Sequence, residues 1–175
     1  MGQEAKLEHV VALLKSLDDQ WICVDGGWGV DALLNVQTRP HADLDLIIRK
    51  TDVAAIELAL TNQQFHKVLE TDGLVYASSE LVVDLHPVRI DSKHYGHFDL
   101  PNGGSWPFPP ETMGAEGQIG DFRVRCLSVD AQVQCHAQGY VLTPKDIDDM
   151  RALQAKFGCV LPLRFYIEGA IPYDT

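Results

Sequence analysis

The stretch that decides the fold reads Val24-Asp-Gly-Gly-Trp-Gly-Val-Asp31 and continues, after a short gap, as Thr38-Arg-Pro-His-Ala-Asp-Leu-Asp-Leu-Ile-Ile48. A glycine pair ends one short apolar run, and an Asp-x-Asp pair stands at the start of a second apolar run. An apolar run that stops at glycines is typical of a buried strand that turns into a helix. The stretch therefore predicts an α/β domain in which a strand–glycine–helix turn accompanies a pair of strand-borne carboxylates.

Length and charge limit what this chain can be. It has 175 residues, 46% of them hydrophobic, which is enough for one compact domain with a real core. We expect a single domain over 1–175, with a core at about 1–100 and a C-terminal extension at about 101–175. The formal net charge is −11 and no Lys/Arg run occurs, so a nucleic-acid partner is disfavoured.

The cysteines and the apolar runs bear on location. The four cysteines show no Cys-x-x-Cys spacing, so we expect reduced thiols rather than disulfides or a zinc site. Residues 1–20 are charged and amphipathic, unlike a signal peptide, and no apolar run reaches the length of a membrane span. We therefore expect a cytoplasmic protein without a membrane partner.

Hydrophobic periodicity and turn signals give the expected order of elements. Helices are expected over 4–17, 30–34, 52–60 with Asp52 as N-cap, 128–136 with Ser128 as N-cap, and from Thr143-Pro144 onward. Strands are expected over 21–24, 44–48, 65–70, 74–78, 81–90 and 122–127, with a hairpin turn at Asp72-Gly73. The Gly- and Pro-rich part of 91–121 is expected to be irregular, apart from a hairpin that ends in 122–127. These elements predict a mixed sheet flanked by helices, with a helical C-terminal end.

The glycine pair and the Asp-x-Asp pair are the first candidate site residues. Gly26 and Gly27 let the backbone approach a ligand closely and leave the amides of a helix N-terminus facing it. Asp43 and Asp45 share one face of a strand, where they repel each other unless a cation lies between them. The alternatives are an ordinary structural turn and a solvated strand edge. Because the glycine turn and the carboxylate pair occur in this order, we favour a triphosphate on the amides and its divalent metal on the carboxylates.

A third carboxylate completes this pattern. Asp84 lies within the apolar run Leu81-Val-Val-Asp-Leu-His-Pro87, and His86 follows on the same face of the strand. An aspartate inside such a strand needs a partner, and a metal held by Asp43 and Asp45 supplies one. His86 is suited to accept the proton of an attacking hydroxyl. The alternative is that Asp84 and His86 pair with each other for structural reasons.

Basic residues near these carboxylates are candidates for contacting phosphate. Arg39 and His41 precede the Asp-x-Asp pair, and we expect both to contribute to nucleotide binding, the alternative being solvated loop residues. Lys145, Asp146 and Asp149 lie on one side of the last helix. They are placed either to reach the triphosphate or to brace the catalytic strand, but an ordinary charged helix face is the favoured interpretation.

These motifs together resemble the small antibiotic nucleotidyltransferases. Asp25-Gly-Gly-Trp-Gly-Val-Asp31 and Thr38-Arg-Pro-His-Ala-Asp-Leu-Asp45 are similar to the motifs of both the lincosamide and the aminoglycoside 2''-adenylyltransferase branches. Val83-Asp-Leu-His-Pro87 resembles the lincosamide branch in particular. The resemblance covers about residues 20–155.

The resemblance implies a fold and an activity. The fold is the polymerase-β-like nucleotidyltransferase fold, and the activity is transfer of AMP from ATP, with Mg²⁺, to a hydroxyl of a small antibiotic, with release of pyrophosphate. In the family pattern Asp43, Asp45 and Asp84 are metal ligands, and His86 matches the histidine proposed as general base. The lincosamide branch is homodimeric, so a homodimer is implied here.

The acceptor is open at this point. A lincosamide is favoured. A polycationic aminoglycoside would need acidic groups around the acceptor, and the acids of 91–121 are Asp91, Asp99, Glu111, Glu116 and Asp121. A different small molecule, a protein or a tRNA is a further enzymatic alternative, and a degenerate nucleotide-binding module is the non-enzymatic one.

Overall fold

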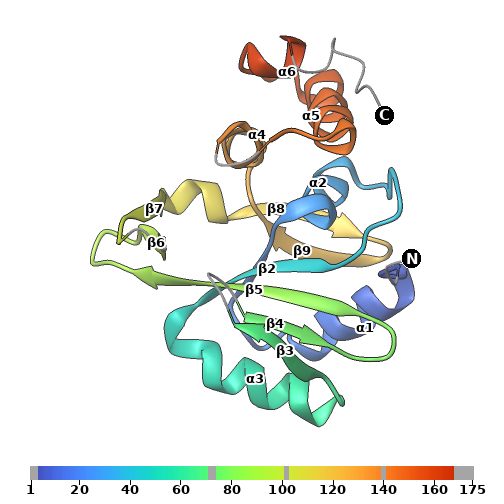
Figure 1. Ribbon diagram of the computed structural model, residues 1–175, viewed down its shortest axis with the longest axis vertical. Coiled ribbons are helices and arrows are strands. Elements are labelled where there is room, and N and C mark those ends of the chain that lie inside the picture. Colours follow the sequence, from blue (N-terminus) through green and yellow to red (C-terminus); the bar gives the residue numbers. More distant parts are fainter. Residues whose placement is uncertain (1–3, 71–73, 101–102, 139–140, 168–175) are drawn as a thin grey trace.

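A mixed nine-stranded sheet organises the chain in the computed structural model, which describes residues 4–70, 74–100, 103–138 and 141–167 (Figure 1). The main strand order is β3-β4-β5-β2-β1-β9-β8, and β6 pairs with both β5 and β7. The strands are β1 (Ile22–Val24), β2 (Leu44–Arg49), β3 (His66–Glu70), β4 (Leu74–Ala77), β5 (Val82–Ile90), β6 (Gly96–Asp99), β7 (Ser105–Phe108), β8 (Ala115–Ile119) and β9 (Phe122–Cys126). The sheet is mixed, because β2 runs parallel to β5 but antiparallel to β1.

Helices lie on both sides of the sheet. They are α1 (Leu7–Ser16), α2 (Gly26–Leu34), α3 (Val53–Asn62), α4 (Val129–Ala137), α5 (Pro144–Phe157) and α6 (Arg164–Ile167), with short 3-10 turns η1 (Lys50–Asp52) and η2 (Pro110–Met113). In Figure 1, α3 lies at the bottom, α1 lies beside β4 and β5, and α4, α5 and α6 lie at the top with α2 beneath α5. Among the described residues, no helix has both the length and the apolar character that a membrane crossing requires.

The central strands send alternate side chains into two separate hydrophobic clusters, as strand geometry requires. The larger cluster takes Leu44, Leu46 and Ile48 of β2 together with residues of α1, α2, α3 and α5. The smaller cluster takes Ile47 of the same strand, with Cys23 of β1 and Val88 of β5. The face that carries the smaller cluster also carries the candidate site, so we call it the site face.

Most of the expected elements are confirmed. The strands of the mixed sheet and the hairpin β8–β9 are present, and Ser128 caps α4 by accepting a hydrogen bond from the Ala131 amide. Thr143 and Asp146 form a capping box at the start of α5. The strands β3 and β4 pair antiparallel, while the expected turn at Asp72-Gly73 lies outside the described residues.

The start predicted for the second helix is wrong. It begins at Gly26 rather than at Val30, because the Asp25 side chain accepts a hydrogen bond from the Gly26 amide and acts as N-cap. The glycine pair is thus the first turn of α2 rather than a loop before it. A Cβ on Gly26 would lie 2.0 Å from an oxygen of Asp45, which explains why glycine is needed at this position.

The prediction that 91–121 is irregular is also wrong in part. The hairpin β6–β7 lies within it and extends the sheet from the end of β5. Pro107 is compatible with β7 because that strand pairs only with β6, so one side of it needs no ladder hydrogen bonds. Proline and glycine hid the strand pattern in the sequence.

Candidate active site

Three strands bring acidic side chains to one end of the site face. Asp45 of β2 and Asp84 of β5 are direct partners in the parallel ladder, so their side chains point the same way. The amide of Asp25, which follows β1, donates to the Asp45 carbonyl at 3.0 Å and fixes Asp25 beside them. His86 follows Asp84 on the same face, and we call these four residues the acid end.

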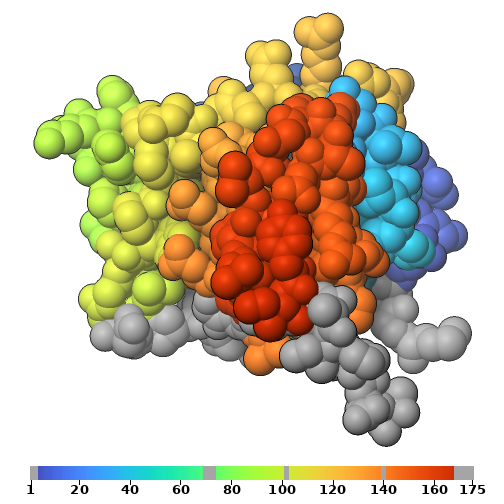
Figure 2. Space-filling view, turned by 90° about the horizontal axis from the view of Figure 1, so that it is seen from above, coloured from blue at the N-terminus to red at the C-terminus, as the bar shows by residue number. Residues whose placement is uncertain are grey.

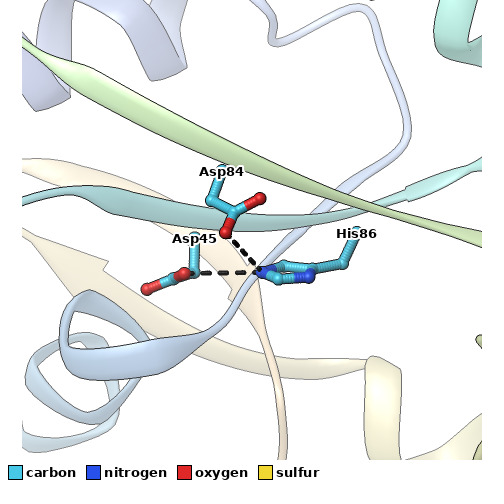
Figure 3. Close-up of side chains that lie close together, drawn as sticks. All are labelled: Asp45, Asp84 and His86. Atoms are coloured by element: carbon cyan, nitrogen blue, oxygen red, sulfur yellow. Dashed lines mark hydrogen bonds and ion pairs between the residues drawn. The ribbon is translucent and has the colours of Figure 1, made fainter. Parts of the chain in front are cut away.

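Three side chains of the acid end, those of Asp45, Asp84 and His86, converge on one point (Figure 3). The Nε2 atom of His86 lies 3.4 Å from Asp45 Oδ1 and 3.9 Å from Asp84 Oδ2. One ligand atom from each of Asp45, Asp84 and His86 lies within 4.8 Å of the others. This spacing fits a single small cation held by two carboxylates, with the imidazole at its edge.

Electrostatics indicate that this end has excess negative charge. Burial and then the nearby carboxylate of Asp45 raise the pKa of Asp43 above its usual value. Burial likewise raises the pKa of Asp84, and the charges of Asp45 and Asp43 add to it. The buried Oδ1 atom of Asp84 has no hydrogen-bond partner among the described residues. Carboxylate oxygens are the ligands that Mg²⁺ prefers, so these residues fit a divalent cation.

His86 balances part of this charge. Burial lowers its pKa, but the hydrogen bond to Asp45 and the charges of Asp45 and Asp84 outweigh burial and raise the pKa to about 9. The imidazole is therefore protonated at neutral pH while no metal ion is bound. It then acts as a positively charged donor between two carboxylates.

A cavity of ≈ 430 Å³ opens beside the acid end. Its walls come from the glycine turn, from the segment before β2, and from the α4–α5 region. The lining residues include Asp25, Gly26, Gly27, Arg39, His41, Asp43, Asp45, His136, Lys145 and Asp146. The N-terminus of α2 therefore lines this cavity, with the Gly26 amide donating to Asp25, and the positive end of the helix dipole suits phosphate.

Arg39 and His41 line this cavity, yet both are engaged by carboxylates. The Nε atom of Arg39 donates to the two oxygens of Asp149 at 3.0 and 3.2 Å, and Nη2 donates at 2.6 Å. His41 pairs with Asp31, and both side chains are buried. The Trp28 ring lies 4.7 Å from the His41 ring. Both residues thus fix the segment that leads to Asp43.

The Arg39–Asp149 ion pair joins the segment before β2 to α5. Figure 2 shows the orange surface of α5 beside the cyan segment around residues 35–45. Asp149 is 3% exposed and Asp146 is also buried, so the charged face predicted for this helix is wrong. Lys145 of the same helix lines the cavity, and its charge lowers the pKa of Asp43.

Asp25 is a site residue to which the sequence motifs assigned no role. Burial raises its pKa above the usual value. Its position between a buried strand and a glycine pair was the available signal. The cysteines are all free, and burial raises the pKa of Cys23 and Cys135, so neither thiol near this site is a ready nucleophile.

The mixed sheet and its flanking helices have the polymerase-β-like nucleotidyltransferase fold. The profile of the aminoglycoside-2''-adenylyltransferase family matches residues 6–153, and the chain belongs to this family.

Known proteins similar to this chain come from two antibiotic branches. A lincosamide resistance protein of Staphylococcus haemolyticus is 26% identical over 162 residues, which cover 87% of this chain and 94% of that protein. The lincosamide antibiotic adenylyltransferase LnuA, in a crystal structure with lincomycin bound, has a TM-score of 0.72 at 24% identity, covering 85% of this chain and 94% of LnuA. The crystal structure of ANT(2'')-Ia with adenylyl-2''-tobramycin has a TM-score of 0.72 at 19% identity, covering 94% of each chain.

Proposed function

We propose that this protein transfers AMP from ATP to a hydroxyl of a small antibiotic, a lincosamide in the first place, and releases pyrophosphate. The acceptor oxygen attacks the α-phosphorus, the bond from this phosphorus to pyrophosphate breaks, and the hydroxyl proton passes to a base of the protein. The observation that carries the proposal is the acid end, with Asp45 and Asp84 in register beside a cavity lined by the glycine turn.

We assign the nucleotide to this cavity. Gly26 and Gly27 let the triphosphate approach the N-terminus of α2 closely, and Lys145 adds a positive charge. Arg39 and His41 contribute to nucleotide binding chiefly by holding the segment before β2 in place. Asp43, Asp45 and Asp84 would hold Mg²⁺, which would supply positive charge to neutralise the triphosphate.

Asp84 and His86 are the two candidates for the general base. Within the described ranges the Oδ1 atom of Asp84 has no hydrogen-bond partner, whereas the Nε2 atom of His86 already lies between two carboxylates. This geometry favours Asp84 as the proton acceptor and His86 as the residue that orients it. A pH–rate profile of His86→Ala that keeps the wild-type shape would support Asp84 as the base.

The surroundings of His86 favour an acceptor of low charge. The Phe98 ring meets the His86 ring edge-on, with 5.7 Å between centroids, so the acceptor side has an apolar wall. Three of the five acids of 91–121 are already paired: Asp91 with His97, Asp99 with Arg89 and Lys50, and Asp121 with Lys15. These pairs leave little free negative charge for a polycationic aminoglycoside.

The resemblance to the lincosamide branch further supports a homodimer that acts in the cytoplasm. Light scattering coupled to size-exclusion chromatography tests the dimer. A monomer at all concentrations would contradict it.

The decisive experiment for the activity incubates the protein with ATP, Mg²⁺ and a panel of lincosamides and aminoglycosides. Mass spectrometry then detects a drug that has gained AMP. We expect an adduct on a lincosamide with the wild type and none with Asp45→Asn. Adducts on aminoglycosides alone would move the assignment to the other branch, and no adduct on any drug would contradict an antibiotic acceptor.

A further inference from the structure

A second cavity lies on the site face, at the opposite end of the same strands. It has a volume of ≈ 260 Å³, and its lining residues are Trp21, Arg49, Ile90, His94, Pro110, Met113, Gly114 and Arg125. Trp21 directly precedes β1, Arg49 ends β2 and Ile90 ends β5. We call Trp21, Arg49, His94 and Arg125 the basic end.

The basic end is separate from the acid end. Asp45 and Arg49 are four residues apart on one strand, a separation of about 13 Å at the rise of a β-strand. The buried side chains of Cys23, Ile47 and Val88 fill the sheet face between the two ends. The cavity at the basic end is therefore not an extension of the nucleotide cavity.

Two guanidinium groups share one indole ring at this end. The Cζ atom of Arg49 lies 5.0 Å from the Trp21 ring centroid, and that of Arg125 lies 5.3 Å from it. Trp21 is half-buried and packs against the smaller hydrophobic cluster, so the ring is a fixed support. An arginine that stacks on an aromatic face keeps its N–H edge available for an anion.

Neither arginine is neutralised within the described parts of the chain. No ion pair to Arg49 or Arg125 is found there, although Glu116 is the ladder partner of Arg125 across β8–β9. No carboxylate lines this cavity, whereas aspartates line the one beside the glycine turn. In a chain with a net charge of −11, such a pocket is a local site of positive potential.

We infer that the basic end binds a small ligand through an oxyanion, a phosphate or pyrophosphate group, held by the Arg49 and Arg125 guanidiniums over the Trp21 ring. The anion comes either free or as the phosphate of a nucleotide. This inference does not depend on the proposed function, because it concerns a different cavity.

The test is binding of inorganic pyrophosphate and of AMP to the full chain without divalent metal, since the metal-free acid end repels anions. Isothermal titration calorimetry gives the affinity, and the indole N–H signal of Trp21 in NMR reports the place. We expect one saturable site, weakened at least tenfold in Arg49→Gln and in Arg125→Gln. Tighter binding of AMP assigns the nucleotide, and tighter binding of pyrophosphate assigns the free anion.

Arg123→Gln is the matched control. It removes the same charge two residues away on β9, from a residue that does not line this cavity. We expect its affinity to equal that of the wild type. The inference is wrong if neither anion binds saturably, if Arg123→Gln weakens binding as much as Arg125→Gln, or if the Trp21 signal does not shift.

Discussion

The acid end and the basic end lie at opposite ends of the site face, yet they are built in different ways. Beside the acid end, buried pairs hold the segment before β2: Arg39 with Asp149, and His41 with Asp31. At the basic end, two exposed arginines rest on one tryptophan. The carboxylates of the acid end repel one another, so buried contacts must hold them in place. At the basic end, stacking on the Trp21 ring is sufficient to position the two arginines.

This difference has consequences for substitution. A change at the acid end removes either a charge needed for chemistry or a buried partner, so its effect should be large. A change at the basic end removes an exposed contact and should leave stability and catalysis nearly intact. The predictions below test this contrast.

Asp45→Asn should have the largest effect on activity. It removes a carboxylate from the centre of the acid end, and we expect AMP transfer to fall at least about 100-fold because a metal ligand is lost. The fold should remain, since the substitution relieves repulsion with Asp84 and Asp43. Steady-state kinetics and circular dichroism measure both effects. Asp130→Asn, an exposed change on α4, is the control, and full turnover by Asp45→Asn would refute the metal assignment.

Asp149→Asn should give the largest loss of stability. It leaves the Arg39 guanidinium, whose side chain is 24% exposed, without its carboxylate. Removing one partner of a buried pair costs about 3–5 kcal/mol, and partial exposure of Arg39 reduces this to about 2–3 kcal/mol. Urea denaturation measures the free energy of unfolding. The control is Asp148→Asn, an exposed neighbour on α5, which should change the free energy of unfolding by less than about 0.5 kcal/mol. Equal losses of stability in the two variants would contradict a stabilising Arg39–Asp149 ion pair.

Gly26→Ala and Gly158→Ala separate backbone strain from close packing. Both glycines have positive φ, +57° and +68°, but a Cβ on Gly158 meets nothing within 4 Å. Each variant should lose about 1–2 kcal/mol from strain. Only Gly26→Ala should also weaken ATP binding, because its Cβ displaces Asp45. Calorimetric titration with ATP and Mg²⁺ measures the affinity of each variant. Equal ATP affinities of Gly26→Ala and Gly158→Ala would contradict the close approach of Gly26 to Asp45.

The metal-free protein should lose stability as the pH rises from about 6.5 to 9. The pKa of His86 is raised to about 9 in the folded chain, so its contribution is present in full below the unfolded value of about 6.5 and is lost as the pH passes the folded value. We expect a loss on the order of 1 kcal/mol, since the site is open to water. Thermal melts in EDTA measure it. His86→Gln should show a flatter profile, and an unchanged slope would mean that other groups cause it.

Arg125→Gln should have the smallest effect of all. Loss of an exposed cation–π contact costs about 0.5–1 kcal/mol, and AMP transfer should keep its wild-type rate. Thermal melts and kinetics check both points. A large fall in kcat would show that the two ends are coupled, and the contrast drawn above would fail.

Much of the architecture followed from local patterns. The periodicity of the apolar residues predicted most strands and helices. The cap Ser128 and the helix start at Thr143-Pro144 were placed correctly, because helix starts depend on residues within one turn. The hairpin β6–β7 was missed since proline and glycine interrupt its alternation. The start of α2 was missed because a glycine pair is compatible both with a turn and with the first residues of a helix.

The candidate site was likewise predicted only where it depends on local spacing. The spacing of Asp84 and His86 indicated that this pair shares a strand face, as it does on β5, because strand geometry repeats every two residues. The same expectation for Asp43 and Asp45 fails, because Asp43 precedes the first residue of β2. The sequence alone did not reveal that Asp149 would be buried against Arg39, 110 residues away. It did not show that Asp25 would lie beside Asp45 either, since this contact depends on the β1–β2 register.

The sequence by itself determined the class of fold and the chemical types at the acid end, because both depend on short-range spacing along strands and turns. Only the tertiary structure decided which side chains share a face, which charges are already paired, and that Trp21, Arg49 and Arg125 form a second end. Those features arise from the alignment of distant strands, which is set by the packing of the whole sheet against its helices.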